Sequence, residues 1–600
     1  MVAKATSTPQ RPARSSARRP AATLPPASMT ILGIDLGTTN TLVAVMRDGS
    51  PTTLPNEAGE HLIPSAVAIA ADGATLVGRA AWDRLVQAPD AGRAFFKRDM
   101  GTAATYPFGG RRWTPVECSA LVLAEAKRVA GLHLPGPLER AVITVPAYFR
   151  ESQRQATAEA AKLAGLGVAR ILNEPTAAAL AHGFRNPEQE TKLLVFDLGG
   201  GTFDVTVLEV FSGVIEVRAS GGESRLGGED YTDALLDLVL QRAGLRRDAI
   251  ELGPLRARIE TLKRRLGVQP QVGLVVAGHE LTLSRDDLAL AGAALTARLR
   301  PVVQQCLRDG RLGRDELDAV LLVGGASRMP LIREFVEKEI GVPLAKDIDP
   351  DRVVALGAAV QAGLVAGDAA VGDLVLTDVC AHTLGIATSK RFANGNVVDG
   401  YFEPIVERNT TVPVSCAKTF QTLFSQQDTI NLEIFQGEAR QTKDNHLLGK
   451  LAVTGLRRPH PELASIEVRF TYDMSGLLEV DVTVLHSGAR FHATIEERPG
   501  TLSKAQIADI RARLQPLRIA SRDRPQHRAR LERANRAFAR LVGPERAALA
   551  ACLDAFEQAL STDRPDEIEP VAAQLDALLA SLPFEEGEWQ PPADGADGEP

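Results

Sequence analysis

The chain has 600 residues, of which 44% are hydrophobic and 24% charged, and its formal net charge is -7 at pH 7. This length is too great for one hydrophobic core and predicts two to four domains. The negative charge, and the lack of a basic stripe interleaved with aromatic residues, argue against a nucleic-acid partner. No apolar run approaches the roughly 18 residues that a membrane-spanning helix needs, so we expect no membrane segment.

The cysteines predict neither disulfides nor a zinc site. They are five in number and widely scattered, and no two form a C-x-x-C pair. This usage fits a reducing compartment, and we expect a bacterial cytoplasmic protein. Residues 1–29 hold Lys4 and four arginines but no acid and no apolar core of a secretory signal. We interpret them as a disordered extension, or Met29 as the initiator, in preference to an organellar transit peptide whose helix the prolines would break.

Residues 30–370 alternate short apolar runs with helical segments, which predicts an α/β domain. ERAVITVP is a strand that ends at Pro146, and the alanine-rich segment ESQRQATAEAAKLAG is a helix that closes at Gly165. Further on, DAVLLVGGASRMPLIREFVEKEI reads as a strand, a glycine turn and a helix. The segment 371–377 (VGDLVLT) follows this domain and is expected to be an interdomain linker.

From 378 to 500 the pattern becomes that of an all-β unit with alternating apolar and polar residues. INLEIF puts Ile430, Leu432 and Ile434 on one face, and a strand, D-M-S-G turn and strand follow, with Leu478, Val480, Val482 and Val484 on one side. From 501 to 583 the pattern is helical; TLSKAQIADIRARL opens with a Thr cap candidate, and Pro516 and Pro525 interrupt the helix. The residues 584–600 are acidic and rich in Pro and Gly, and we expect them to be a disordered tail.

Two matching segments suggest the chemistry. ILGIDLGTTNTLVAV at 31–45 and LLVFDLGGGTFDVTV at 193–207 are each an apolar strand with an aspartate, a tight Gly/Thr turn and a second apolar strand, which predicts a β-hairpin. Backbone N–H groups in such a turn form a nest for an anion. An aspartate beside a phosphate repels it unless a divalent cation lies between them. We therefore predict a magnesium nucleotide held between hairpins of two duplicated half-domains; no Walker A motif occurs.

Five motifs in order resemble the ATPase domain of the heat shock protein 70 chaperone family (DnaK type), a member of the actin and sugar-kinase superfamily. They are DLGTTN at 35–40, NEPTAAALAHG at 173–183, DLGGGTFDVTV at 197–207, RLGGED at 225–230 and LLVGGASRMP at 321–330. DVCAHTLGIAT at 378–388 and GYFEPIVERNTTVP at 400–413 extend the resemblance, and DVC points to the HscC branch. The resemblance implies an actin-like (duplicated ribonuclease H-like) α/β ATPase domain, a β-sandwich that binds peptides, and a short α-helical lid.

The resemblance also implies roles for single residues. The catalytic set would be Lys97 at the γ-phosphate, Glu174, Asp197, Asp204 and Thr202, with Mg²⁺ held largely through water by Asp35, Asp197 and Asp204 and with potassium nearby. Positioning of the attacking water and charge neutralisation would do most of the catalysis. The remaining ATP contacts would come from Gly37, Thr38, Thr39, Asn40, Gly199, Gly200, Gly201, Gly227, Gly228, Glu260, Lys263, Arg264, Gly324, Gly325, Arg328 and Asp351.

The adenosine contacts have a basis in spacing as well. Glu260, Lys263 and Arg264 are three and four residues apart, so one helix face can present all of them. By resemblance, Glu260 and Lys263 hold the ribose, and Arg264 and Arg328 stack on the adenine, which planar guanidinium groups suit. Gly267 stands where the family usually has Ser, so we expect one adenine hydrogen bond fewer. A solvated basic helix face is the alternative interpretation of this stretch.

Coupling and peptide binding follow from the resemblance alone. Pro146 and Arg154 match a proline switch and its relay arginine, Arg170 and Asp378 match a pair that bears on J-domain contact, and Leu374, Val375 and Leu376 match the linker core. Thr377 replaces the last linker leucine, which predicts weaker docking. Residues expected to line the peptide pocket are Ile386, Phe420, Leu423, Ile430 and Leu432, although periodicity alone makes each a core residue.

Together these features predict an ATP-dependent chaperone that binds extended hydrophobic segments of unfolded proteins, with a J-domain co-chaperone as partner. The shortened region between Asp230 and Glu260 leaves the exchange factor open. The alternatives are a specialised member with a weakly coupled ATPase and few clients, a small-molecule kinase of the same nucleotide fold, and an actin-class filament former. The all-β unit after 377 argues against the last two.

Overall fold

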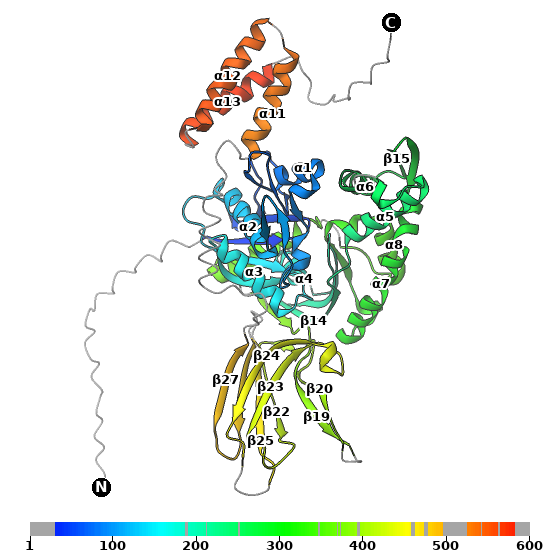
Figure 1. Cartoon of the computed structure of the whole chain (residues 1–600), viewed down its shortest axis with the longest axis vertical. Coiled ribbons are helices and arrows are strands. Elements are labelled where there is room, and N and C mark those ends of the chain that lie inside the picture. The colour runs from blue at the N-terminus through cyan, green and yellow to red at the C-terminus, as the bar shows by residue number, and fades with distance from the viewer. Residues whose placement is uncertain are drawn as a thin grey trace, which may run out of the picture.

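The computed structural model has three parts: an α/β body, a β-sandwich below it (yellow) and a group of helices beyond the end of the body that carries α1 (orange), as Figure 1 shows. The structure describes residues 30–185, 190–211, 213–249, 252–345, 348–368, 370–372, 374–392, 396–457, 462–472, 478–495, 525–541, 543–561 and 565–581. No helix among these residues is long and apolar enough to cross a membrane.

The first sheet of the α/β body contains the hairpin predicted at 31–45, which is confirmed. Its order is β11-β10-β1-β2-β3, with β4 beside β2, and β1 has β10 as its parallel neighbour. Helices α2 and α3 bury Leu32 and Ile34 on one face. The elements are β1 (Ile31–Leu36), β2 (Asn40–Arg47), β3 (Ser50–Thr53), β4 (Ile63–Pro64), β10 (Arg140–Val145), β11 (Gly167–Asn173), α2 (Pro115–Gly131) and α3 (Glu151–Leu163).

Smaller elements of this half form the wall that carries Lys97. A three-stranded sheet β6-β5-β7 packs against α1, and the one-turn helix η2 follows it. Their bounds are β5 (Ala66–Ile69), β6 (Thr75–Val77), α1 (Arg79–Gln87), η1 (Pro89–Ala91), β7 (Gly92–Ala94), η2 (Phe96–Asp99), β8 (Tyr106–Phe108) and β9 (Arg111–Trp113).

The second sheet repeats this arrangement and confirms the second predicted hairpin. Its order is β17-β12-β13-β14-β18-β21, and β12 has β17 as its parallel neighbour, as β1 has β10. Helices α5 to α8 share a core with it. The elements are β12 (Thr191–Leu198), β13 (Phe203–Phe211), β14 (Val214–Glu223), α5 (Gly228–Ala243), η3 (Arg247–Ala249), α6 (Leu252–Leu266), β15 (Gln271–Val276), β16 (His279–Ser284), α7 (Arg285–Gly310), η4 (Arg314–Glu316), β17 (Ala319–Val323), η5 (Gly325–Arg328) and α8 (Pro330–Glu339).

Two helices, α4 (Glu174–Arg185) and α9 (Val353–Ala366), join the two halves of the body. Their alanines and valines form one core with Ile31 and Val142 of the first sheet and with Leu193 and Val195 of the second. The helices touch at Gly357, where a Cβ atom would lie 1.7 Å from the carbonyl oxygen of Ala177. The two halves therefore pack around one shared pair of helices.

The segment expected to be the linker forms part of a strand. β18 (Val375–Val379) pairs in parallel with β14 and antiparallel with the two-residue strand β21 (Thr411–Val412). Leu376 is buried in the core shared by the two halves, whereas Val375 is exposed. One sheet thus runs from the α/β body into the first strand pair of the β-unit.

The β-unit is a sandwich of two four-stranded sheets, β20-β19-β23-β24 and β22-β25-β26-β27. The predicted faces are confirmed, because Leu478, Val480, Val482, Val484, Leu432 and Ile434 are buried and Ile430 packs half-buried against the same core. The D-M-S-G turn lies outside the described residues. The strands are β19 (Leu384–Arg391), β20 (Val397–Val406), β22 (Val414–Gln421), β23 (Thr429–Gln436), β24 (His446–Thr454), β25 (Ser465–Tyr472), β26 (Leu478–Val484) and β27 (Arg490–Ile495), with η6 at Thr442–Asp444.

The C-terminal helices described are α11 (Pro525–Arg540), α12 (Gly543–Ser561) and α13 (Pro565–Ser581). They pack around Phe556 and Leu549 in a core of their own. Pro525 stands at the first residue of α11, where proline is tolerated because the missing N–H has no helical partner there. The predicted helix at 501–514, the residues 1–29 and the acidic tail at 584–600 lie outside the described residues.

The contact at Gly357 predicts a strong effect of one methyl group. Gly357→Ala should destabilise the α/β body by about 2 kcal/mol or more, because the added carbon overlaps the backbone of α4. Gly131→Ala in α2, where nothing lies within 4 Å of the added carbon, is the matched control and should be neutral or slightly stabilising. Urea unfolding of both variants measures the difference. Equal stability of Gly357→Ala and the native protein would contradict this packing.

Candidate functional site

A cavity of about 300 Å³ lies where the two glycine hairpins of the α/β body face each other. Both hairpins, the start of α4, the helix η2 and the helix α6 contribute to its wall. Most residues predicted from the sequence border it: Asp35, Gly37, Thr38, Thr39, Asn40, Lys97, Glu174, Asp197, Gly199, Gly200, Thr202, Gly228, Glu260, Lys263, Arg264, Gly324, Gly325, Arg328 and Asp351.

At one end of the cavity, the buried carboxylates of Glu174, Asp197 and Asp204 and the half-buried Asp35 gather around a single ammonium group. Asp35 lies near the end of β1 and accepts a hydrogen bond from Thr144 Oγ1 at 2.9 Å. Asp197 and Asp204 are directly paired across the hairpin β12–β13, which puts their side chains on the same side of the sheet. Lys97 Nζ donates to Glu174 Oε1 at 2.6 Å, and both side chains are buried.

The electrostatics of this cluster follow from burial. Burial, with the nearby charge of Glu174, raises the pKa of Asp35 to about 7 and that of Asp204 to about 8. Burial, followed by the charges of Glu174 and Asp204, also raises the pKa of Asp197 well above its usual value. Lys97 opposes these shifts but cannot neutralise four carboxylates. The cluster therefore has more carboxylates than nearby cations and would be stabilised by additional positive charge.

The donor set fits a hydrated magnesium ion. Carboxylate oxygens are the ligands that Mg²⁺ prefers, and Mg²⁺ usually keeps several of its waters. Asp197 Oδ2 is buried and has no hydrogen-bond partner among the described residues. Within the same residues no three His, Cys, Asp or Glu side chains are close enough to bind a metal ion directly.

The other end of the cavity is formed by one face of α6, as the spacing predicted. Glu260 pairs with Lys263 Nζ at 2.6 Å and with Arg264 Nε at 2.7 Å. Although burial alone would raise the pKa of Glu260, these two cations lower it to about 2. Arg328, at the end of η5, pairs instead with Asp349 and Asp351. Arg264 and Arg328 both border the cavity, and so does Gly267.

Three predicted residues do not border the cavity. Asp204 lies behind Asp197 and accepts a hydrogen bond from the Tyr148 N–H at 3.1 Å. Gly201 and Gly227 pack against each other, since a Cβ on Gly227 would lie 2.5 Å from Gly201 N. Sequence reasoning missed Glu229, which borders the cavity and whose pKa is raised by burial and by Glu260. It stands inside the quoted motif RLGGED, so its position beside two glycines was the available signal.

The residues expected to couple the domains lie together where β18 enters the sandwich. Asp378 accepts hydrogen bonds from Asn173 Nδ2 at 2.9 Å and from Thr176 Oγ1 at 3.2 Å. Arg154 Nη2 donates to Asn173 Oδ1 at 2.5 Å. Arg170 donates to Gln361 of α9 at 3.1 Å. Asn173 directly precedes Glu174, so the start of the sandwich is one residue away from the cavity wall.

A second contact between the sandwich and the site runs through Tyr148, just after Pro146. Its N–H bonds to Asp204, and its carbonyl oxygen lies 3.2 Å from His382 Nε2. The ring centres of Tyr148 and His382 are 4.2 Å apart. Burial lowers the pKa of His382 to about 4, so the imidazole is neutral near pH 7. Sequence reasoning gave no role to His382.

The five residues expected to bind peptide lie in the sandwich but do not share one environment. Ile386 and Leu432 are buried in its core, and Phe420 and Ile430 pack at the edge of that core. Leu423 follows β22, and its carbonyl oxygen accepts from Arg391 Nη2 at 3.0 Å. The Arg391 guanidinium also lies 5.6 Å from the ring centre of the exposed Phe424. The pocket role of these residues stays a prediction.

The family model for Hsp70, described as "Hsp70 protein", matches residues 31–108 and 102–583. Two similar half-domains around a carboxylate-lined cleft, followed by a β-sandwich, define the class of ATPase chaperone to which this match points. The chain belongs to the Hsp70 family. Members of this family are chaperones that use ATP and Mg²⁺ and act on unfolded polypeptides with J-domain co-chaperones.

The raised pKa of Asp204 predicts a pH-dependent stability. The unfolded chain ionises this group near pH 3.8, whereas the folded chain holds its proton to about pH 8. The stabilisation that the raised pKa gives is therefore complete at low pH and is lost as pH rises through this window. Asp204→Asn, which stays neutral, should become more stable relative to the native protein between pH 5 and pH 8, by at most about 4 kcal/mol.

Urea unfolding in EDTA at pH 5, 6.5 and 8 measures this difference. Asp237→Asn on the exposed face of α5 is the matched control, and its effect should change little with pH. A constant difference between Asp204→Asn and the native protein across the three pH values would contradict the assignment.

Proposed function

We propose that this protein is an ATP-driven chaperone in which hydrolysis at the cavity between the two hairpins controls peptide binding by the β-sandwich. The observation that carries the proposal is the meeting of both glycine loops and the carboxylates at one cavity, whose wall residue Glu174 is the neighbour in the chain of Asn173, which bonds to Asp378 of β18. Under this proposal residues 30–370 form the ATPase domain, 378–500 the peptide-binding domain and 501–583 the lid.

The residues around the cavity would have different roles in ATP hydrolysis, according to where they lie. Backbone N–H groups of the two loops, around Thr38 and Gly200, would hold phosphate oxygens as anion nests. Asp35, Asp197 and Asp204 would hold magnesium through water, and the ion would supply positive charge that neutralises the phosphate oxygens. Lys97 would turn from Glu174 toward the terminal phosphate, and Glu174, so released, would orient the attacking water. Asp197 would accept the hydrogen bonds of water around the metal, since its free oxygen points to no protein donor among the described residues.

Coupling would use the two contacts already described. A change in Glu174 on hydrolysis moves Asn173, its neighbour in the chain, and hence the hydrogen bond to Asp378. Arg154 would relay the same change from Pro146. Arg170 and Asp378 would influence the contact with a J-domain partner. Placement in the HscC branch and a role for potassium are parts of this proposal that sequence resemblance alone supports, and a specialised member with a weakly coupled ATPase and few clients stays the alternative.

The decisive experiment is single-turnover ATP hydrolysis by the full chain with and without an unfolded peptide. The expected result is a slow basal rate that the peptide increases. A peptide that neither binds nor changes the rate would contradict the chaperone mechanism and leave an uncoupled ATPase.

Asp197→Asn separates catalysis from binding. We expect the hydrolysis rate to fall by about a hundredfold, as for loss of one positioned electrostatic group, with ATP affinity changed far less. Asp237→Asn, the same exchange on the exposed face of α5, is the control and should hydrolyse ATP at the native rate. Normal turnover by Asp197→Asn would refute the assignment of Asp197.

Leu376→Asp tests the coupling strand β18. Because Leu376 is buried in the core shared by the two halves, a carboxylate there should displace the strand and abolish peptide stimulation while basal hydrolysis persists. Val375→Asp introduces the same charge at the exposed neighbouring position and should keep the stimulation. The ratio of stimulated to basal rate measures the effect, and equal ratios in both variants would argue against coupling through β18.

A further inference from the structure

Two consecutive residues of opposite charge on η2 reach from the first half of the body to the second. Arg98 Nη2 lies 2.5 Å from Asp230 Oδ2, and its Nη1 lies 3.3 Å from Asp230 Oδ1, which is a two-pronged ion pair. Asp99 Oδ1 lies 3.6 Å from Arg225 Nη2. Asp230 and Arg225 are the two ends of the segment RLGGED. We name the pairs Arg98–Asp230 and Asp99–Arg225 the clasp.

The pairing is reciprocal in sign, which fixes its register. In the first half, the positive Arg98 is followed by the negative Asp99. In the second half, their partners Asp230 and Arg225 carry the opposite charges at the two ends of the six-residue segment RLGGED. A shift of one residue would bring like charges together, at a cost in free energy. Asp99 is further oriented by Tyr106, whose hydroxyl donates to it at 2.7 Å. The clasp therefore holds the two halves in one relative position.

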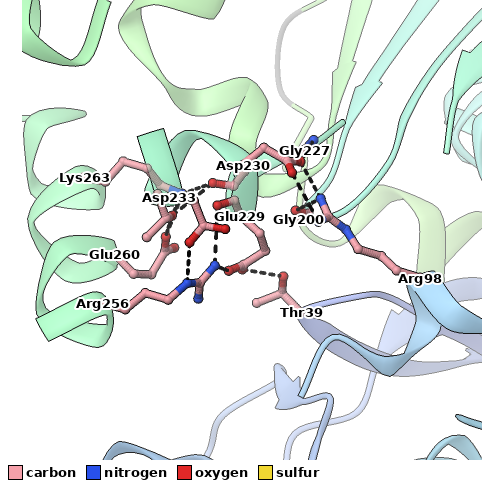
Figure 2. Close-up of polar contacts among 12 residues, drawn as sticks. Thr39, Arg98, Gly200, Gly227, Glu229, Asp230, Asp233, Arg256, Glu260 and Lys263 are labelled. Carbon is pink, nitrogen blue, oxygen red and sulfur yellow. Dashed lines mark hydrogen bonds and ion pairs between the residues drawn. The ribbon is translucent and has the colours of Figure 1, made fainter. Parts of the chain in front are cut away.

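Figure 2 shows that Arg98 and Asp230, the first pair of the clasp, lie beside Gly200 and Gly227. Arg98 Nη2 donates to the carbonyl oxygen of Gly200 at 3.4 Å, and Asp230 Oδ2 accepts from the Gly227 N–H at 2.7 Å. Gly201 lies close to both Arg98 and Thr38, because a Cβ on Gly201 would lie 2.6 Å from Arg98 Nε and 2.7 Å from Thr38 Cγ2. The Arg98 side chain thus contacts the second glycine loop and the RLGGED turn.

A weaker contact joins the halves beside the clasp. Thr39 Oγ1 donates to Glu229 Oε1 at 3.4 Å, and Arg256 holds Glu229 Oε2 at 2.8 Å, as Figure 2 shows. The Arg256 guanidinium also lies 5.3 Å from the ring centre of Phe95 in the first half. These contacts support the same closed arrangement, but the two-pronged ion pair of Arg98 is the shorter and better aligned.

We propose that the clasp closes the two halves over bound nucleotide and sets how long the nucleotide stays, with Arg98 acting as a positioning residue for Lys97. The proposal rests on the nucleotide site proposed above. Release of a phosphate chain held between the two loops requires the halves to separate, and separation breaks Arg98–Asp230 and Asp99–Arg225. Because Lys97 directly precedes Arg98 in the chain, anchoring the Arg98 side chain also fixes the backbone position of Lys97.

The two pairs contribute unequally. The side chains of Arg98 and Asp230 are 20% and 25% exposed, whereas that of Arg225 is 72% exposed. Partly buried charge-assisted hydrogen bonds are stronger than exposed ion pairs, which contribute little and are screened by salt. Arg98–Asp230 is therefore the main element of the clasp, and Asp99–Arg225 is the minor one.

The test is the dissociation rate of a fluorescent ADP from the full chain, followed by stopped flow. Asp230→Asn keeps an oxygen to accept from Gly227 but removes the charge, and should speed release about tenfold. Arg98→Lys should speed it by a similar factor, and Asp99→Asn by about twofold. The double variant with both Arg98→Lys and Asp230→Asn should be no faster than either single variant, because each breaks the same pair.

A further measurement separates positioning from general destabilisation. Asp230→Asn should raise the ADP dissociation rate far more than it lowers the single-turnover hydrolysis rate at saturating ATP. Arg247→Lys and Asp237→Asn, at an exposed ion pair within the second half, are the matched controls and should release ADP at the native rate. Unchanged release by Asp230→Asn and Arg98→Lys, with ADP binding by the native protein intact, would overturn the clasp alone. Absence of ADP binding by the native protein would overturn the proposed function and the clasp with it.

Discussion

Buried negative charge is the constraint on which the rest of the structure depends. Asp35, Asp197 and Asp204 lie beside the buried pair Lys97–Glu174, which leaves them short of positive charge. Carboxylates in such a place stay protonated or recruit a cation. Holding them there takes two hairpins from two sheets, and holding the sheets in register takes the shared helices α4 and α9. The two sheets and the helices α4 and α9 together keep these carboxylates close to one another.

The same cluster lies at the origin of both contacts with the sandwich. Glu174 is adjacent to Asn173, which bonds to Asp378, and Asp204 bonds to Tyr148, whose carbonyl oxygen lies beside His382. Each route contains one residue that senses the charge of the cleft and one that belongs to the β-unit. Both routes are short, because each joins a residue of the cluster to a residue of the β-unit through one or two hydrogen bonds.

Much of this arrangement was predictable because it depends on local pattern. The hairpins at 31–45 and 193–207, the Glu260–Lys263–Arg264 face and the alternation at 478–484 follow from period and spacing, and the structure has them. The clasp was not predictable, since Arg98 and Asp230 are far apart in the chain and each is ordinary for an exposed position. His382 was missed for a similar reason: a lone histidine has no signature until the fold puts it against Tyr148. Long-range pairing is what local patterns lack.

The close contact of α4 with α9 has a consequence for motion. At Gly357 the two helices meet backbone to backbone, leaving no room for one to slide over the other. We therefore expect the two halves of the body to move mainly by rotating about this helix pair. In such a rotation the displacement of an atom grows with its distance from the α4–α9 axis. A small rotation would therefore open the cleft most at the rim that lies farthest from these helices.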